Sequence, residues 1–182
     1  VPRHLFLDPE QFDNAYVDTA LPIGHAQTIS QPFVVALMSE MLLTATKKNQ
    51  RVLEIGTGCG YQTAILSHLF DRVYSVERIL SLLQRAEKNL ELLSINNATL
   101  QHGDGTTGWP GQETFDAIIV TAASDNLPQP LLALLEADTC LIAPIGAPGH
   151  QQLTTLRNQN GLISSKTTEA VRFVPLLSGI CD

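Results

Sequence analysis

The sequence has few cysteines, few basic residues and no long hydrophobic run. Its three cysteines, Cys59, Cys140 and Cys181, are too few and too widely spaced for a disulfide framework or a CxxC metal site, so no metal is predicted. Eleven Lys and Arg residues stand against 18 Asp and Glu, which gives a net charge of −7 at pH 7. The longest basic run is Lys47–Lys48, which argues against a phosphate-binding surface and a nucleic-acid partner.

Two further absences concern the membrane and the secretory pathway. No apolar run approaches the length of a membrane span, and no secretory signal is recognisable. We therefore expect a reducing cytoplasm and no membrane partner. The chain opens with VPRHLF and without methionine, so we expect some N-terminal sequence to precede it.

What is present is a globular composition, 44% hydrophobic and 16% charged over 182 residues. This predicts a single domain, residues 1–182, with a substantial core. Residues 1–32 are rich in Pro, Asp, Gln and Gly and predict an irregular N-terminal arm.

Apolar residues at helical spacing follow Pro32, and the strongest helical periodicity covers residues 79–93. Two shorter helices are predicted over about 62–70 and 130–136. Apolar runs predict strands over 51–56, 72–77, 98–102, 115–122 and 139–146. Near the end, residues 151–158 and a segment ending at 170–176 flank Gln159-Asn160-Gly161, which predicts an antiparallel pair around an Asn-Gly turn.

This alternation of strands and helices predicts an α/β fold with a doubly wound, mostly parallel sheet of about seven strands. Because the strands are almost continuously apolar, helices should cover both faces of the sheet, with an antiparallel strand pair at the C-terminal end. Ligands of such sheets bind outside the carboxyl ends of the strands.

The stretch VLEIGTGCG (52–60) places Gly56, Gly58 and Gly60 directly after a predicted strand. A dinucleotide favours the spacing G-x-G-x-x-G, whereas Tyr61 stands where the third glycine would be. Glu77 ends the second strand about 20 residues after the first glycine, where an acid accepts hydrogen bonds from ribose hydroxyls. Both NAD and S-adenosylmethionine carry such a ribose.

Two acidic residues favour S-adenosylmethionine over NAD. Glu54 precedes the glycines, where its negative charge would attract a sulfonium or ammonium cation and repel a pyrophosphate. Asp104, in the segment HGDG after the third strand, could accept a hydrogen bond from the adenine amino group. Each feature alone is compatible with an ordinary turn or a solvated strand end.

Several motifs together resemble the protein-L-isoaspartate O-methyltransferases of the class I S-adenosylmethionine-dependent superfamily. They are VPRHLF, ALPIGHAQTISQP, VLEIGTGCGYQTA, YSVERI, HGDG, GWP, FDAIIVTAA and VRFVPL, which extend from Val1 to Leu176. The segment LPIGHAQTISQP is the most specific, since general class I methyltransferases lack it. The resemblance implies a Rossmann-like methyltransferase fold with an unusual order of the last strands.

The resemblance implies methyl transfer to the free α-carboxylate of L-isoaspartyl residues in damaged proteins and peptides. The products would be S-adenosyl-L-homocysteine and an ester that leads through a succinimide towards normal aspartate. On this reading the irregular arm, residues 1–32, contributes to the substrate site. We expect its acidic part, Asp8–Asp18, to fold against or over the cofactor cleft, and residues 21–32 to form part of the substrate wall. Ser30 matches the family's active-site serine. The positions that match cofactor contacts are Glu54, Gly56, Thr57, Gly58, Gly60, Glu77, Arg78, Asp104 and Gly105. Those that match substrate contacts are Thr28, Ile29, Ser30, Thr121, Ala122, Ala123 and Arg172.

The proposed chemistry suits these residue types. A carboxylate is already ionised at neutral pH, so it needs orientation and exclusion of water rather than a strong general base. We therefore interpret Ser30 as a hydrogen-bond donor that positions the substrate. The alternative is that Ser30 caps the helix that starts near Phe33.

Other residues also have structural interpretations. His25 is expected to be a structural hydrogen-bonding residue, Arg172 could pair with a surface acid, and Trp109 could anchor its loop. Cys59 replaces a serine common in the family, and Ala26 stands where glycine is frequent, which could stiffen the arm.

Two other functions stay open at this point. One is a methyltransferase of the same fold that acts on a small molecule. The other is a non-catalytic adaptor that binds damaged proteins. A monomer is expected.

Overall fold

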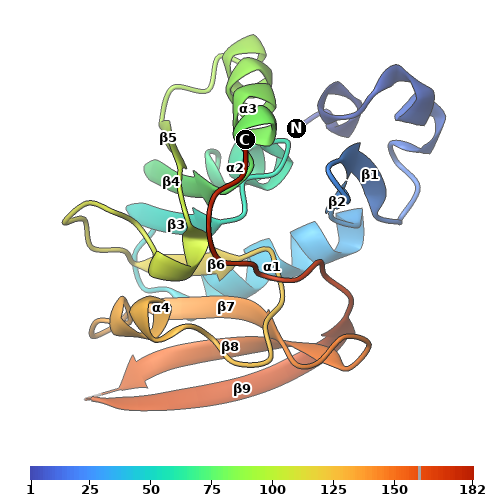
Figure 1. The fold of residues 1–182 in the computed structure, drawn as a ribbon. Coiled ribbons are helices and arrows are strands. Elements are labelled where there is room, and N and C mark those ends of the chain that lie inside the picture. The colour runs from blue at the N-terminus through green and yellow to red at the C-terminus, as the bar shows by residue number, and fades with distance from the viewer. Residues whose placement is uncertain (160) are drawn as a thin grey trace.

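The computed structural model describes residues 1–159 and 161–182. Its centre is a seven-stranded sheet in the order β5-β4-β3-β6-β7-β8-β9 (Figure 1). The strands are β3 (Arg51–Ile55), β4 (Arg72–Glu77), β5 (Ala98–His102), β6 (Ala117–Val120), β7 (Cys140–Ile145), β8 (Gln151–Gln159) and β9 (Leu162–Val171). The pairs among β5, β4, β3, β6 and β7 are parallel, whereas β8 pairs antiparallel with both β7 and β9. The predicted fold class is confirmed.

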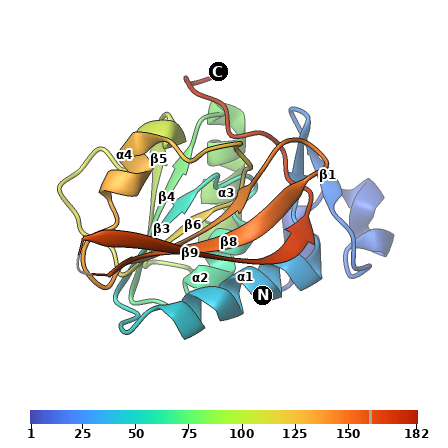
Figure 2. The ribbon, with the colours of Figure 1, turned by 90° about the horizontal axis from the view of Figure 1, so that it is seen from below.

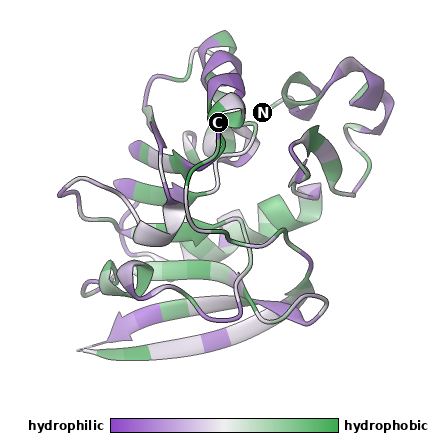
Figure 3. Ribbon diagram, viewed as in Figure 1, coloured by the Kyte–Doolittle hydropathy of each residue, from purple (hydrophilic) through white to green (hydrophobic). Residues whose placement is uncertain are grey.

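Helices cover both faces of the sheet (Figure 2). One face carries α1 (Pro32–Ala45), α2 (Tyr61–Leu66) and α3 (Leu80–Leu92), and the other carries η3 (Gly105–Thr107) and α4 (Gln129–Ala133). Successive β3 side chains point to opposite faces, so Val52 packs with Met38 of α1 while Leu53 packs with Leu131 of α4. This two-sided burial explains why β6 and β7 are largely apolar along their length, as Figure 3 shows.

The predicted helix over 62–70 is shorter than expected, because α2 ends at Leu66. The side-chain amide of Asn97 donates to the carbonyl oxygens of Ser67 and Phe70, at 2.8 and 3.1 Å. These bonds satisfy carbonyl groups at the helix end and favour a turn in place of a further helical turn. No helix among the described residues has the length and hydropathy needed to cross a membrane.

The prediction that residues 1–32 are irregular is wrong. They form η1 (Arg3–Phe6), η2 (Pro9–Asn14) and a hairpin of β1 (Leu21–Gly24) and β2 (Gln27–Ile29). His25 and Ala26 make the two-residue turn with φ of 52° and 56°, the left-handed conformation that tight hairpins require. Proline, glycine and short strands concealed the alternation that buries Leu21, Ile23 and Ile29 in the core.

The C-terminal antiparallel pair is confirmed, but its second strand lies earlier than predicted. β9 ends at Val171, and the chain then leaves the sheet edge. Asn160, in the predicted turn, lies outside the described residues. The last segment, 172–182, crosses the carboxyl ends of the strands (Figure 1). The backbone of Ala123 bonds to Val174 and Leu176 at 2.8 and 2.7 Å, and the N–H of Cys181 donates to the Arg78 carbonyl at 2.7 Å.

Candidate active site

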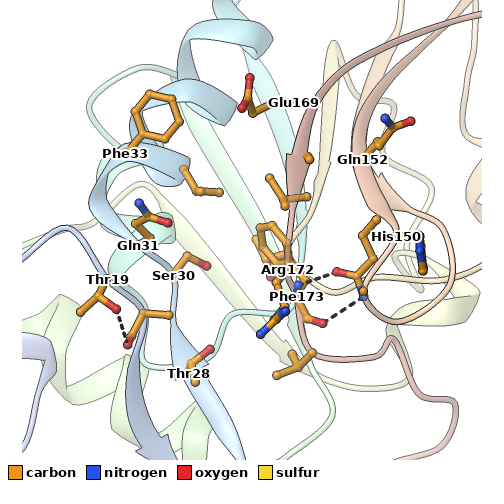
Figure 4. A pocket seen from close by; sticks show the side chains of 18 residues that line it. Thr19, Thr28, Ser30, Gln31, Phe33, His150, Gln152, Glu169, Arg172 and Phe173 are labelled. Atoms are coloured by element: carbon orange, nitrogen blue, oxygen red, sulfur yellow. Dashed lines mark hydrogen bonds between the residues drawn. The ribbon is translucent and has the colours of Figure 1, made fainter.

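Two main cavities lie where the parallel strands end. The outer cleft has a volume of about 940 Å³, and the segments around Ser30 and Arg172 form its opposite walls (Figure 4). The inner cavity, about 70 Å³, lies on the glycine loop after β3. A third space of about 40 Å³ lies between Ser30 and Tyr61.

Thr28 and Thr121 line all three of these spaces. Thr28 belongs to the N-terminal hairpin, whereas Thr121 follows β6. The two threonines therefore mark the point where a molecule in the inner cavity would meet one in the outer cleft.

The glycine loop is held tightly against Thr121. Gly56 has φ of 99°, a conformation that strains any residue with a side chain. A Cβ atom at Gly56 would collide with Oγ1 of Thr121. That same oxygen donates toward the carbonyl groups of Ile55 and Gly56, at 3.0 and 2.7 Å. The absence of a side chain therefore lets the loop approach β6 and keeps its backbone at the cavity wall.

Glu77, at the end of β4, forms hydrogen bonds with both the glycine loop and the segment that follows β4. One carboxylate oxygen accepts from the N–H of Gly58 at 2.8 Å, and the other accepts from the N–H of Ile79 at 2.9 Å. Each oxygen keeps a second lone pair, and Glu77 lines the inner cavity. The carboxylate can therefore accept hydrogen bonds from hydroxyl groups of a bound molecule.

Asp104 lies beside the inner cavity and is not among its lining residues. Its Oδ1 accepts from the backbone and hydroxyl of Thr106, at 2.8 and 2.6 Å, while Oδ2 accepts from the N–H of Gly179 at 2.6 Å. Burial alone would raise the pKa of Asp104, but the hydrogen bonds from Gly179 and Thr106 hold it below its usual value. Asp104 thus fixes the C-terminal segment over this end of the sheet.

Glu54 lies directly before the glycine loop but is not on a cavity wall. Its side chain is fully buried and lines none of the three spaces. Oε2 accepts hydrogen bonds from the hydroxyls of Thr63 and Ser75, on the α2 side of the sheet. Burial raises the pKa of Glu54 to about 8, so the group is largely uncharged at neutral pH. The role of Glu54 toward a cofactor cation therefore stays a prediction, because a cation near the glycine loop would change this charge state.

Ser30 lies on the rim of the outer cleft, and its hydroxyl makes no hydrogen bond among the described residues. Gln31 is the residue that precedes α1, and the carboxylate of Asp18 accepts from the N–H of Phe33 at 2.8 Å. The interpretation of Ser30 as the helix cap is therefore wrong. Arg172 also lines the cleft, without an ion pair or hydrogen bond among the described residues, so its guanidinium is available to a carboxylate.

Comparison with protein families shows which family the chain belongs to. The family model described as protein-L-isoaspartate(D-aspartate) O-methyltransferase matches residues 1–180. The chain belongs to this methyltransferase family. A protein-L-isoaspartate O-methyltransferase from Hahella chejuensis is 48% identical over 180 residues, which cover 99% of this chain and 85% of the relative. One from Pseudomonas syringae pv. tomato is 52% identical, with 98% and 84% covered.

Solved structures of the methyltransferase family share the whole fold. A putative family member from Plasmodium falciparum, in complex with S-adenosyl-L-homocysteine, has a TM-score of 0.83 at 29% identity, and covers 96% of this chain and 85% of that one. Another protein-L-isoaspartate O-methyltransferase gives a TM-score of 0.85 at 28% identity, with 99% and 59% covered.

The structure brings most of the residues matched to the methyltransferase family to the cavity walls. Those that line at least one space are Thr28, Ile29, Ser30, Gly56, Thr57, Gly58, Glu77, Arg78, Gly105, Thr121, Ala122 and Arg172. Glu54, Gly60, Asp104 and Ala123 do not line them. Gly60 begins α2, and Ala123 is a buried backbone anchor for the C-terminal segment.

The structural interpretations of two other residues are confirmed. The indole N–H of Trp109 donates to Glu113 at 2.7 Å, and its ring packs on Tyr74, so it anchors its loop. His25 bonds to the Ser81 hydroxyl at 2.8 Å. The acidic stretch 8–18 lines neither the outer cleft nor the inner cavity, because Asp8 pairs with Arg85 of α3 and Asp18 binds the start of α1.

Sequence reasoning missed one buried residue beside the cleft. Arg3 is 1% exposed and donates to the backbone carbonyls of Ser30 and Thr19. The periodicity of a short 3-10 helix gives no signal for such a contact, since the partners are 16 and 27 residues away.

Proposed function

We propose that this chain is a protein repair methyltransferase, which moves a methyl group from S-adenosylmethionine to the free α-carboxylate of L-isoaspartyl residues. The observation that carries the proposal is the pair of connected spaces, an inner cavity on the glycine loop and an outer cleft, which meet at Thr28 and Thr121. A nucleoside-linked donor in the first and a peptide in the second would place the reacting atoms at these threonines. The domain is 1–182, with the arm 1–32 supplying part of the peptide wall.

The residues of the inner cavity fit S-adenosylmethionine. Glu77 offers lone pairs to ribose hydroxyls, and apolar side chains of Ile23, Val76 and Ile79 offer flat walls to adenine. The buried Oε1 of Glu54 has no hydrogen-bond partner among the described residues, so it can accept from a donor such as an ammonium group near the loop. Such a cation would also lower the pKa of Glu54.

The inner cavity must widen before it can hold this cofactor. Its 70 Å³ is well below the roughly 300 Å³ of small ligand pockets. Leu176 and Leu177 of the C-terminal segment form part of its wall. Oδ2 of Asp104 accepts only from Gly179 and keeps a second lone pair, which the adenine amino group can use once the cavity widens. Because Leu176 and Leu177 form the wall beside it, the C-terminal segment is the part that we expect to move.

When bound, S-adenosylmethionine supplies an electrophilic methyl group. The chain's own residues orient the carboxylate that attacks it. The Ser30 hydroxyl donates a hydrogen bond to one carboxylate oxygen and the Arg172 guanidinium attracts the group, while the other oxygen faces Thr28 and Thr121. No proton is removed in this step, because the carboxylate is ionised at neutral pH. The hairpin and the C-terminal segment exclude water from the reacting atoms.

The partners that follow from this function are damaged proteins and peptides with isoaspartyl linkages. The outer cleft, with a volume of about 940 Å³, is open to solvent, which suits a peptide segment. We propose a cytoplasmic monomer that binds neither nucleic acid nor membranes, in keeping with the net charge of −7.

A matched pair of peptides that differ only in an aspartyl or isoaspartyl linkage tests the proposal. With labelled S-adenosylmethionine, base-labile methyl groups should appear on the isoaspartyl peptide alone. Transfer to a metabolite and to neither peptide would favour a small-molecule methyltransferase. Tight cofactor binding without turnover would favour an adaptor.

A further inference from the structure

Arg3 is a buried cation that no carboxylate in the described part of the chain contacts directly; Asp18 acts on it only at longer range. Its guanidinium donates to the carbonyl oxygen of Ser30 at 2.6 Å and of Thr19 at 3.2 Å, and lies 5.2 Å from the centre of the Tyr61 ring. No carboxylate lies within ion-pair distance of it among the described residues. Its Nε also lacks a partner there.

Burying such a charge costs free energy that two carbonyl dipoles and an aromatic face offset only in part. Burial lowers the pKa of Arg3, yet a guanidinium stays protonated in proteins. An apolar side chain of similar size would fill the space at less cost, so packing alone does not account for an arginine.

Both carbonyl groups that Arg3 holds belong to residues that line the outer cleft. Tyr61, under the guanidinium, opens α2 directly after the glycine loop. Arg3 therefore joins the Ser30 wall of the cleft to the element that follows the inner cavity. Its positive charge lies against the backbone of Ser30, the residue whose hydroxyl is on the cleft rim.

We propose that Arg3 is a positioning residue for the anionic substrate. It holds the Ser30 peptide so that the hydroxyl faces the cleft, and its charge, which no carboxylate of the described residues neutralises by direct contact, favours a substrate carboxylate there. This inference rests on the proposed function. Methyl transfer neutralises the carboxylate, so the field of Arg3 stabilises the bound anion more than the transition state. Its loss should therefore raise KM more than it lowers kcat.

Arg85 provides a matched control. It also donates to two backbone carbonyls of the arm, those of Phe6 and Ile23 at 3.0 and 3.3 Å. Unlike Arg3, it pairs with a carboxylate, that of Asp8 at 3.1 Å, and it does not line the outer cleft. A substitution there loosens the arm without removing charge from behind Ser30.

The test compares Arg3→Gln, Arg3→Lys and Arg85→Gln with the parent chain, using the isoaspartyl peptide and its neutral α-carboxamide analogue as an inhibitor. We expect Arg3→Gln to raise KM about tenfold, with the affinity for S-adenosylhomocysteine unchanged. The preference of Arg3→Gln for the carboxylate peptide over the carboxamide analogue should fall by the same factor as KM rises. Arg3→Lys should keep KM within about threefold of the parent, and Arg85→Gln should not move it.

Equal KM shifts in Arg3→Gln and Arg85→Gln, or an unchanged preference for the charged peptide, would overturn the inference. If Arg3→Gln does not fold, a Lys variant whose KM rises as kcat stays constant would contradict the role of charge. If the parent chain methylates no isoaspartyl peptide, the proposed function fails, whatever the Arg3 variants do.

Discussion

The inner cavity and the outer cleft are built in different ways. Short loops at the ends of neighbouring parallel strands form most of the inner cavity, and its key acid, Glu77, bonds to Gly58 across a single strand pair. The outer cleft joins the hairpin near Ser30 to the segment near Arg172 at the opposite end of the chain. The first site therefore depends on local backbone conformation, and the second depends on how distant segments pack.

The largest effect should come from Gly56→Ala. The new Cβ would collide with Thr121 and would require a left-handed backbone, so we expect a loss of about 3 kcal/mol in unfolding free energy and at least a hundredfold weaker binding of S-adenosylhomocysteine. Calorimetric titration measures the affinity. Gly161→Ala, with φ of 85° and no atom near its Cβ, is the control for backbone strain alone. Equal effects of Gly56→Ala and Gly161→Ala would show that the close approach of Gly56 to Thr121 is unimportant.

Ser30→Ala tests whether the two sites are separable. The variant lacks the donor that faces the cleft, so kcat/KM for the isoaspartyl peptide should fall by about 10- to 100-fold. The affinity for S-adenosylhomocysteine should stay within about twofold. Ser164→Ala, on exposed β9, is the control. Similar losses of peptide turnover and cofactor affinity would contradict a substrate-facing role.

Asp104→Ala should act on the inner cavity alone. The loss of bonds to Thr106 and Gly179 should raise the dissociation constant for S-adenosylhomocysteine about fivefold and cost about 1 kcal/mol of stability. Because the folded pKa of Asp104 is lowered, this stabilisation is present above its unfolded pKa, near 4, and is lost as pH falls through the folded value. Denaturant titrations of parent and variant should therefore converge at low pH. An unchanged cofactor affinity would remove Asp104 from that site.

Glu54→Gln probes the buried group beneath the glycine loop. Because the folded pKa is raised to about 8, the protonated carboxyl stabilises the fold fully below its unfolded pKa, near 4.5, and this contribution is lost as pH rises to about 8. The neutral amide cannot ionise, so the melting temperature of the variant should change less between pH 5 and 8.5. Parallel profiles for both proteins would mean that Glu54 is ionised throughout this range.

Ala26→Gly should have the smallest effect. Ala26 has φ of 56° in the hairpin turn, where glycine avoids the Cβ strain, so we expect a gain of about 0.5–1 kcal/mol in unfolding free energy. Ala20→Gly, just before the hairpin and without a positive φ, should lower stability slightly. Thermal unfolding distinguishes them. A loss of unfolding free energy in both variants would show that Ala26 in the turn is not strained.

The parallel half of the sheet could be predicted because each strand is an apolar run separated by helical periodicity. The glycine loop and Glu77 followed from their spacing along that pattern. The N-terminal hairpin could not be predicted, since its strands are short and its turn uses His25 and Ala26 in place of glycine. Ser30 and Arg172 were identified only through resemblance, because no local pattern signals two segments that meet through tertiary packing.

Glu54 shows a different limit. Its position before the glycines does not reveal which face of β3 its side chain takes. Alternation along β3 turns its side chain toward Thr63 and Ser75, where burial changes its charge state. Sequence spacing places a residue near a loop, whereas the protonation state depends on the surrounding dielectric and donors.

The C-terminal segment has a consequence for the order of events. Arg172 to Val174 line the outer cleft, and Val174 to Leu177 line the inner cavity, so one continuous stretch of backbone forms a wall of both. A molecule that shifts this stretch in one cavity changes the shape offered in the other. Thermodynamic reciprocity then requires that each ligand alter the affinity of the other by the same factor. Donor exchange and peptide release are thereby coupled events in one catalytic cycle.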